Sequence, residues 1–528
     1  MTDLAATELD DHRRAVDVVG RRLWAAAYRE GLAEPPASAS RHAFNRSEPS
    51  LPVTEPPGAI LDRIGVEAFE LRTELDDAVA NLTVALSRRR DIDGAWRKVA
   101  ADRGIDDAYG VIAGLDPDAQ AVAFEQLATE GHNLHPCGRT RLGWGRGDLL
   151  AYDQESPEVD VAFVAIRSDR HVGEDIGGLL RHTYPQVPPA DDGYVMQPVH
   201  PWQLENVLRD RYADQFADGA LREVGDAMLS AVPTTALRTL LLEPDVRGLR
   251  HYLKLSLDIQ VTSTRRSISV ASTRNGPAIS DILRRLITDP RVLVLPEVAG
   301  AAMTGTRDVA AIIREGLNRR LGPREVAIPG SSLPAVSPIS GRTILAEVVD
   351  RSGMTASDFL SAYARLLLPQ ALRLLDKGVG LEAHLQNSIP IFLDGRPHRI
   401  AFRDCAGLRL NPARLADHGV DVRLWPGSVI GTPDQNVVRS KLGYTAFHAH
   451  LGELVLRLSE SHGLDEPSAW RSIRALVDEV YDDGDLDPAD REFLIAPTMP
   501  HKALVRMRLA DDGDRYVPVA NPLRIRVP

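Results

Sequence analysis

The sequence predicts an α+β fold in which a helical, a strand-rich and a mixed part follow one another along the chain. Three observations support this prediction. Apolar residues recur at helical spacing through most of the first part, short β-branched runs dominate the second, and long helical stripes return in the third together with a hairpin. We therefore expect domains at residues 1–129, 130–335 and 336–528.

In the first part, helical periodicity covers residues 3–33, and two or three amphipathic helices are expected over residues 66–129. Between them, residues 34–57 are too rich in proline and serine for a helix or a central strand. We expect a surface loop or a mobile lid there.

In the second part, residues 159–166 (VDVAFVAI) predict a strand, and residues 193–202 predict a strand followed by a turn. Residues 251–269 alternate apolar and polar side chains, which predicts one half-buried strand. Residues 291–299 predict another strand.

In the third part, residues 357–378 predict a long helix that ends at Gly378. A hairpin follows, SIPIFL and HRIAFRD joined through an Asp-Gly turn. Residues 442–462 and 467–482 predict amphipathic helices, and residues 502–509 predict a strand.

Composition narrows the class of protein. The chain has 528 residues, of which 44% are hydrophobic and 26% charged, as in globular proteins. A net charge of −12 argues against a nucleic-acid-binding protein. No apolar leader and no apolar run long enough to cross a membrane is present, so we expect a cytoplasmic protein without a membrane segment. Cys137 and Cys405 are too few for a disulfide framework. There are five lysines among 62 basic residues, which makes each lysine notable.

Three polar clusters are candidates for a functional site. The first follows Glu130 and contains His132, His135, Arg139 and Arg141 in a loop with glycines and a proline. Such a loop suits an anion better than zinc. A solvated basic loop is an equally good interpretation.

The second cluster combines Arg238 and Thr239 with a polar strand face and an arginine pair. Its residues on that face, at a period of two, are Lys254, Ser256, Asp258, Gln260 and Thr262, followed by Arg265 and Arg266. Hydroxyls, a lysine and a bidentate arginine are what phosphate recognition requires. A solvated strand face remains the alternative.

The third cluster lies at a helix-to-strand junction and faces an acid on the returning strand. It contains Glu382, His384, Gln386 and Asn387, with Asp404 after the hairpin. Carboxylates in this arrangement favour a Mg²⁺ and phosphate site. A structural network that holds the hairpin is the alternative.

Familiar catalytic motifs are missing from the sequence, namely the P-loop, GxGxxG after a strand, HExxH and GxSxG. His448 and His450 are expected in the core or at the surface. In HPWQ (200–203), Trp202 is expected to pack.

Taken together, the motifs resemble those of the siderophore synthetases that work without a non-ribosomal peptide synthetase, the aerobactin-type IucA/IucC family. The matching stretches are GHNLHPCGRTRLG (131–143), HPWQ (200–203), PTTALRT (233–239), KLSLDIQVTSTRRSI (254–268), EAHLQN (382–387), RDCAG (403–407), HKALVRMRL (501–509) and NPL (521–523). They span residues 130–523.

The resemblance implies a cupped hand of three domains: a helical thumb, β-rich fingers, and a palm with an antiparallel sheet and helices. It further implies a homodimeric ligase of siderophore biosynthesis that uses ATP and Mg²⁺. Such an enzyme adenylates a polycarboxylic acid such as citrate or a citrate or succinyl derivative. It then condenses the acid with an amine or hydroxyl compound, releasing AMP and pyrophosphate.

The resemblance also implies roles for individual residues. Nucleotide contacts fall on His135, Arg139, Arg238, Thr239, Lys254, Gln386, Asn387 and Asp404. The residues implied to contact the acid and the attacked phosphate are Thr262, Arg266 and His384. Lys254 is implied as a fourth catalytic residue. Metal contacts fall on Glu382 and Asp404.

This chain departs from the family pattern at two positions. The motif serine of PTxSxRT is Ala236, so a phosphate contact is missing unless Thr234 or Thr235 replaces it. Arg139 stands where a lysine is usual, which changes the donor geometry. The chain is also somewhat short for the family.

Two other functions remain open. A small-molecule phosphotransferase would use His384, Asn387 and Asp404 in a kinase-like order. Gln386, however, stands at the position of the catalytic aspartate and cannot accept a proton. A degenerate synthetase that binds nucleotide or citrate without turnover is the other, and Ala236 supports it.

Overall fold

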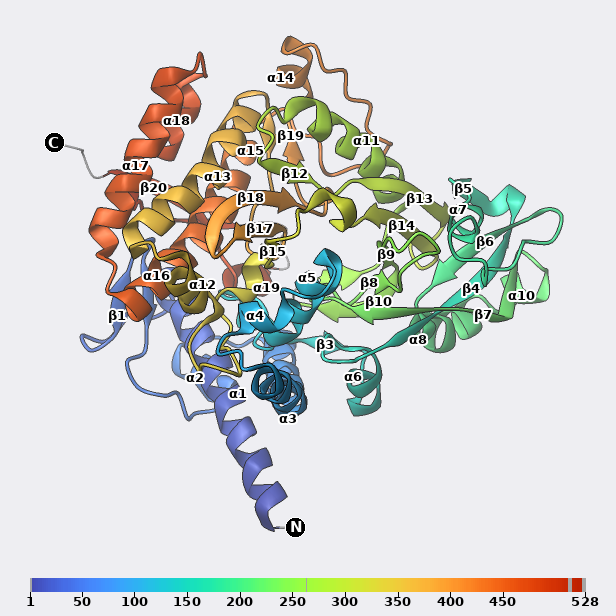
Figure 1. The fold of residues 1–528 in the computed structure, drawn as a ribbon, viewed down its shortest axis with the longest axis horizontal. Coiled ribbons are helices and arrows are strands. Elements are labelled where there is room, and N and C mark those ends of the chain that lie inside the picture. The colour runs from blue at the N-terminus through green and yellow to red at the C-terminus, as the bar shows by residue number, and fades with distance from the viewer. Residues whose placement is uncertain (1, 263, 511–514, 525–528) are drawn as a thin grey trace.

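The computed structural model describes residues 2–262, 264–510 and 515–524. It is an α+β fold, as the sequence predicts. In Figure 1 the strand-rich part extends to one side, the helices of the C-terminal part gather on the other, and the N-terminal helices lie below both. Within the described residues, no helix is long and apolar enough to cross a membrane.

The N-terminal part is helical, as predicted. Helices α1 (Thr2–Arg29) and α3 (Phe69–Arg103) pack against each other, with α2 (Pro57–Arg63) against both. Residues 34–57 contain a small antiparallel ribbon that the sequence did not predict, β1 (Ser40–His42) and β2 (Arg46–Glu48). Helices α4 (Ala108–Ile112) and α5 (Pro117–Leu127) bury side chains in the largest hydrophobic core, which they share with the C-terminal part.

An eight-stranded antiparallel sheet forms the middle of the molecule. Its strand order is β5-β13-β14-β9-β8-β7-β4-β6. The strands are β4 (Val159–Arg167), β5 (His171–Gly173), β6 (Tyr194–Val199), β7 (Leu221–Pro233), β8 (Thr239–Leu242), β9 (His251–Leu255), β13 (Glu297–Met303) and β14 (Ala310–Glu315). Helices α7 (Ile176–Arg181) and α11 (Val270–Leu286) pack on it, while α6 (Arg146–Tyr152), α8 (Pro201–Gln203), α9 (Arg209–Arg211) and α10 (Ala213–Ala217) lie around it.

The prediction of one strand over residues 251–269 is wrong. The chain leaves the large sheet at Ser256, whose backbone N–H donates to Ala310 at 3.0 Å and whose hydroxyl donates to Arg307 at 2.8 Å. It continues as β10 (Leu257–Val261) and β11 (Thr264–Arg266), which form a second sheet with β3 (Arg141–Leu142). The polar face expected from Lys254 to Thr262 is therefore divided between two sheets.

The strand predicted over residues 291–299 is also divided. Residues Val292–Val294 form β12 in one sheet, and β13 begins after Pro296 in the other. Proline lacks the N–H group that a continuous ladder needs, so the break falls at this position.

A four-stranded sheet of order β12-β18-β17-β15 lies in the C-terminal part, where β12 runs parallel to β18 and the other pairs are antiparallel. Its hairpin is β17 (Ser388–Leu393) and β18 (Arg396–Phe402), and β15 is Glu325–Ala327. The predicted Asp-Gly turn is confirmed, since Asp394 and Gly395 have φ of 51° and 79°.

Helices cover this sheet. The long helix α13 (Ala356–Asp376) is buried along its leucine stripe and ends just before Gly378, as predicted. Each fully buried leucine contributes about 2 kcal/mol through loss of apolar surface. The other elements are α12 (Ile344–Ser352), β16 (Val379–Gly380), β19 (Arg409–Leu410), α14 (Pro412–Asp417), α15 (Gln435–Leu442), a π-helical turn (Gly443–Leu451), α16 (Gly452–His462), α17 (Glu466–Asp483) and α18 (Pro488–Leu494).

The end of the chain corrects one more prediction. Residues 502–509 are not a strand: β20 (Thr498–Lys502) ends where the predicted strand begins, and Arg506–Ala510 form helix α19. The backbone N–H groups of Val505 and Arg506 donate to the carboxylate of Glu30, which caps this helix from α1. Strand β21 (Tyr516–Ala520) pairs with β20.

Candidate active site

Three of the predicted motifs contain a residue with a strained backbone. Leu237, Thr262 and Asp404 have φ of 60°, 58° and 65°, in the left-handed region that non-glycine residues rarely adopt. For the β-branched Thr262 this conformation is an outlier. Such strain costs about 1–3 kcal/mol and concentrates at functional sites, so it marks these three motifs as candidates for one.

The side chain of Lys254 links the large sheet to the loop after the hairpin through an ion pair. It lies on β9 opposite Thr239 of β8, and its Nζ is 2.7 Å from Asp404 Oδ1 and 3.5 Å from Glu297 Oε1. The lysine side chain is 3% exposed. Burial alone would raise the pKa of Asp404, but the charge and hydrogen bond of Lys254 hold that pKa well below its usual value. Glu297 was not among the predicted residues.

A second pair of opposite charges lies around Glu382. Lys441 Nζ is 3.1 Å from its carboxylate, and Asn387 Nδ2 donates to the same group at 3.2 Å. Burial opposes ionisation, but the charge of Lys441 lowers the pKa of Glu382 below its usual value, and Asp404 acts in the other direction. Lys441 was missed because it belongs to no matched motif, although its rarity in this sequence was a signal.

His384 is neutral at physiological pH. Burial lowers its pKa, against the attraction of Glu382, whose carboxylate lies 3.9 Å from Nε2. The backbone N–H of Asn387 donates to Nδ1 at 3.3 Å, which leaves the proton on Nε2. The imidazole can therefore donate a hydrogen bond to an anion but does not supply a full positive charge.

Two arginines lie together beside the second sheet. Arg238 Nη1 donates to the carbonyl of Arg266 at 2.7 Å, and Arg266 Nη2 donates to Thr262 Oγ1 at 3.2 Å. Burial, together with the nearby charges of Arg238 and Arg141, lowers the pKa of Arg266 to about 10. Arg266 remains charged near pH 7, so this group of like charges favours an anion.

His135 presents a polar atom that needs a partner. Its Nδ1 accepts from the backbone N–H of Cys137 at 3.0 Å, which places the proton on Nε2. Nε2 is buried and has no hydrogen-bond partner within the described part of the chain. Burial, followed by the charges of Lys502 and Arg508, lowers the pKa of His135 to about 3. Both basic residues belong to the C-terminal motif HKALVRMRL. This motif therefore lies close to the first cluster.

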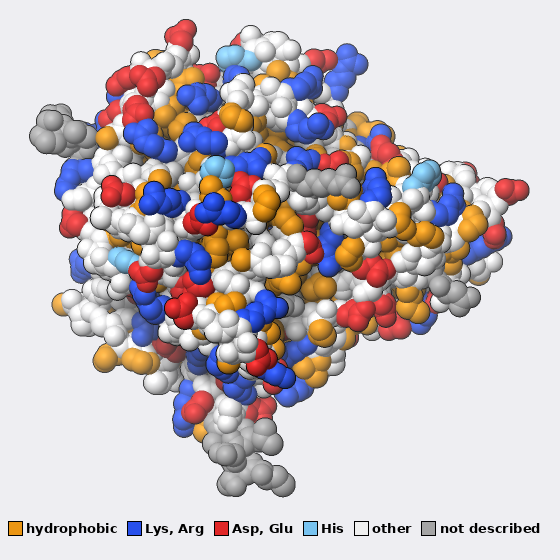
Figure 2. Space-filling view, in the orientation of Figure 1, with side chains coloured by type: hydrophobic (Ala, Val, Ile, Leu, Met, Phe, Trp, Pro, Cys, Tyr) orange, Lys and Arg blue, Asp and Glu red, His pale blue; other side chains and the backbone are white. Residues whose placement is uncertain are grey.

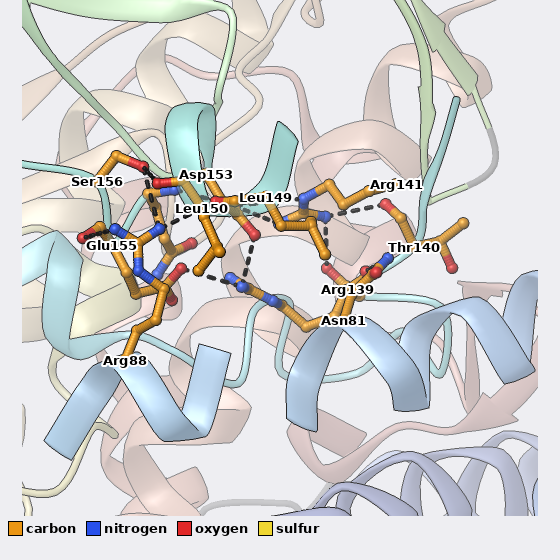
Figure 3. Close-up of polar contacts among 12 residues, drawn as sticks. Asn81, Arg88, Arg139, Thr140, Arg141, Leu149, Leu150, Asp153, Glu155 and Ser156 are labelled. Carbon is orange, nitrogen blue, oxygen red and sulfur yellow. Dashed lines mark hydrogen bonds and ion pairs between the residues drawn. The ribbon is translucent and has the colours of Figure 1, made fainter. Parts of the chain in front are cut away.

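Arg139 is placed differently from the other predicted residues. Its guanidinium donates to Asp153 at 2.7 Å and lies 3.1 Å from Glu155, and its side chain is 1% exposed (Figure 3). Arg88 of α3 donates to the backbone of Leu149 and of Glu155 in the same network. In this conformation the guanidinium is engaged with carboxylates and is closed to solvent.

The hydroxyls that could replace the missing motif serine are already engaged. Thr234 Oγ1 donates to the carbonyl of Thr239 at 2.8 Å, and Thr235 Oγ1 donates to Glu125 at 3.2 Å. Gln386 Nε2 donates to Thr235 at 3.3 Å. The loss of a hydroxyl at Ala236 is therefore not made good in this conformation.

The two carboxylates fit a magnesium ion that is shared with phosphates. Among the described residues, no cluster of three or more His, Cys, Asp or Glu side chains could hold a metal. Mg²⁺ is commonly bound through one or two carboxylates, water and substrate phosphates. Glu382 and Asp404 can supply that number, and each has a lysine beside it that a phosphate could take over.

The two histidines expected in the core or at the surface, His448 and His450, lie in the core. His448 and His450 are 3% and 0% exposed, and His450 Nδ1 lies 2.9 Å from the carbonyl of Ala383. In HPWQ, Trp202 packs as predicted, while His200 and Gln203 are fully buried. On the face shown in Figure 2, acidic and basic side chains are interspersed rather than gathered by sign.

Comparison with known proteins finds two family matches in this chain. Residues 120–335 match the IucA / IucC family, and residues 357–517 match the family described as ferric iron reductase FhuF-like transporter. The IucA / IucC match therefore covers the strand-rich middle of the chain and contains the first two of the three polar clusters.

The proteins and solved structures similar to this chain include the following three. A D-ornithine–citrate ligase of Staphylococcus aureus is 26% identical, over 88% of this chain and 79% of that protein. The petrobactin biosynthesis protein AsbB of Bacillus anthracis superposes with a TM-score of 0.81 at 20% identity, covering 98% and 97% of the two chains. ATP-bound aerobactin synthetase IucA of Klebsiella pneumoniae superposes with a TM-score of 0.71 at 21% identity, covering 96% and 99%. These superpositions confirm the fold.

Proposed function

We propose that this chain is an ATP-dependent ligase of siderophore biosynthesis. It adenylates a polycarboxylic acid, citrate or a citrate or succinyl derivative, and condenses the acyl-adenylate with an amine or hydroxyl compound. AMP and pyrophosphate are the other products. The S. aureus relative, named as a ligase of D-ornithine and citrate, supports this class of acid and nucleophile.

The observation that carries the proposal is the convergence of buried hydrogen-bond donors and cations from all three clusters. Lys254, Arg238 and Arg266 supply positive charge, while His135 and His384 offer neutral N–H groups. In a chain with a net charge of −12, such a concentration needs an anionic ligand to justify its desolvation. A triphosphate beside a polycarboxylate meets that requirement.

The proposed reaction has two steps. A carboxylate oxygen of the acid bonds to the α-phosphorus of ATP, and the bond from that phosphorus to the pyrophosphate oxygen breaks. The nucleophile then bonds to the acyl carbon, loses a proton, and displaces AMP. Both steps pass through states with added negative charge on oxygen, which fixed donors stabilise without reorganisation.

The roles of the residues follow from their charge and position. We assign Arg238, Thr239 and Lys254 to the triphosphate, and Thr262, Arg266 and His384 to the acid and the α-phosphate. The remaining nucleotide contacts in the proposal are His135, Gln386, Asn387 and Asp404. Because pyrophosphate is a good leaving group, holding the acid in line with the α-phosphate accounts for much of the rate increase.

The proposal includes a magnesium ion held by Glu382 and Asp404. When bound, Mg²⁺ neutralises phosphate charge and orients the leaving group. Arg139 is retained as a predicted nucleotide contact, although its ion pairs favour a role in holding the loop of His135. Division of the chain at residues 129 and 335, assembly into a homodimer and location in the cytoplasm stay predictions.

Pyrophosphate release tests the proposal. The protein is incubated with ATP, Mg²⁺ and a panel of di- and tricarboxylic acids, each with hydroxylamine as nucleophile. We expect release that depends on one acid and is lost in Arg266→Ala and His384→Ala. Arg265→Ala is the matched control, because this neighbouring arginine is 66% exposed and pairs with Asp258.

The other products decide between the alternatives. Release of ADP without pyrophosphate would replace the proposal with a phosphotransferase. Gln386 argues against that outcome. Its amide donates to Thr235 and cannot accept a proton, as the catalytic aspartate of a kinase does. Binding of nucleotide without either product would identify a degenerate synthetase.

A further inference from the structure

Four residues from distant parts of the chain form a hydrogen-bonded ring that closes through one backbone carbonyl. Gln386 Nε2 donates to Thr235 Oγ1 at 3.3 Å, and Thr235 Oγ1 donates to Glu125 Oε2 at 3.2 Å. Arg403 closes the ring. Its Nη2 pairs with Glu125 Oε1, and its Nε donates to the backbone carbonyl of Gln386 at 2.9 Å. Glu125 lies outside every matched motif, so it was not among the predicted site residues.

The Glu125–Arg403 pair of the ring is buried, Thr235 and Gln386 are half-buried, and the carboxylate is fully used. The side chains of Glu125 and Arg403 are 1% and 4% exposed. Besides the two side-chain partners, Glu125 Oε2 accepts the backbone N–H of Thr235 at 2.8 Å. In surroundings of low polarity each of these hydrogen bonds is strong, and a broken one leaves a costly unpaired group. The ring therefore has one preferred arrangement.

Each segment held by the ring carries proposed nucleotide contacts. Arg238 and Thr239 follow Thr235 by three and four residues, and Gln386 is itself a member. Asp404, the partner of Lys254, directly follows Arg403. Helix α5, which supplies Glu125, packs against the C-terminal part through β15. A shift of the carboxylate would move contacts on both sides of the site.

We propose that Glu125 is a positioning residue of the nucleotide site. Through the ring, it orients the Gln386 amide and holds the segments around Thr235 and Arg403 in register before ATP binds. This inference rests on the proposed function, because it takes the ligand to be a nucleoside triphosphate. Glu125 itself contacts protein groups and acts through Gln386 and Arg403.

The sharpest test changes Thr235 rather than Glu125. Glu125→Gln would leave the buried guanidinium of Arg403 without its counter-charge, and the variant could fail to fold. Thr235→Val keeps the shape but removes the hydroxyl that links Gln386 to Glu125. Thr235→Ser keeps the hydroxyl. Thr273→Val is the control for loss of a threonine hydroxyl outside the ring, since the hydroxyl of the buried Thr273 donates to a backbone carbonyl in α11 at 2.8 Å.

The primary readout is the Kd for ATP, measured by calorimetry on the full-length protein without acid. One hydrogen bond is worth about 0.5–1.5 kcal/mol, so we expect Thr235→Val to weaken ATP binding about three- to tenfold. Thr235→Ser should restore the affinity, and Thr273→Val should leave it unchanged. In turnover, the KM for ATP should rise with little change in kcat, because a ground-state contact is lost.

Each outcome decides the inference. Unchanged ATP affinity in Thr235→Val would overturn it, and so would an equal loss in Thr273→Val or a loss that serine does not restore. If the wild-type protein binds ATP but releases no pyrophosphate with any acid, the proposed function fails while the affinity series still judges the ring. A wild-type protein that does not bind ATP would overturn both.

Discussion

The ion pairs of Lys254 predict a graded loss of stability when their members are replaced. Lys254→Met removes one cation and leaves two carboxylates, Glu297 at 3.5 Å and Asp404 at 2.7 Å, without it. Breaking a buried ion pair by removing one partner costs about 3–5 kcal/mol. Asp404→Asn removes the group that is 23% exposed and leaves Lys254 with Glu297, so we expect a loss of about 1–2 kcal/mol.

Thermal unfolding followed by circular dichroism and calorimetry measures this difference. The entropy of unfolding of a 528-residue chain is about 1.1 kcal/mol/K. For unfolding as one unit, Lys254→Met should lower Tm by about 3–5 °C and Asp404→Asn by about 1–2 °C. Lys98→Met, at an exposed position of α3, is the matched control and should leave Tm unchanged.

The stability contribution of Asp404 should also depend on pH in a defined direction. The pKa of Asp404 is lower in the folded protein than in the unfolded chain, where it is about 3.9. Its contribution to stability is therefore present above about pH 4 and is lost as the pH falls through the folded-state pKa. The Tm difference between wild type and Asp404→Asn should narrow below about pH 4. An Asp404→Asn variant that loses as much stability as Lys254→Met would refute the reasoning.

Three further predictions follow from the charges and hydroxyls of the site and its surroundings. Ala236→Ser should lower the KM for ATP about two- to fivefold in the pyrophosphate assay, since it adds the missing hydroxyl; an unchanged KM would show that this position does not reach phosphate. Glu453→Gln should lower Tm, because it removes the carboxylate that pairs with the buried Arg46 at 2.7 Å and leaves Arg46 with Glu48 alone. Burial opposes ionisation of Glu453, but Arg46 holds its pKa below the usual value, so the Tm difference should be full above about pH 4.3 and shrink as the pH falls. Arg139→Met should lower Tm, because it removes the Nη2 group that bonds the buried carboxylates of both Asp153 and Glu155, and a loss of ATP affinity at unchanged Tm would instead support a direct nucleotide contact.

Sequence patterns found the elements whose structure is set locally. The Asp394-Gly395 turn follows from the φ that those two residues tolerate, and α13 follows from its leucine stripe. The rarity of lysine also pointed to the site, because Lys254 and Lys441 both hold carboxylates there. In these cases the information lies within a few residues of the feature that it predicts.

Features decided by distant contacts could not be predicted in this way. The alternation of residues 251–269 continues through Ser256, but the chain changes sheets there because Ala310 and Arg307 accept its hydrogen bonds. Glu125 likewise reads as an ordinary acidic residue of an amphipathic helix. Its partners lie more than a hundred residues away in the chain, so no local pattern marks it.

The ion pairs of the unliganded site explain how the site can hold buried lysines before a polyanion binds. Burying the ammonium groups of Lys254 and Lys441 alone would cost several kcal/mol each. Asp404 and Glu382 offset that cost in this structure. In the proposed function, a triphosphate would take over the two lysines, and the two carboxylates would then be available to Mg²⁺. Lys254, Lys441, Asp404 and Glu382 would then each have a partner of opposite charge both before and after this exchange.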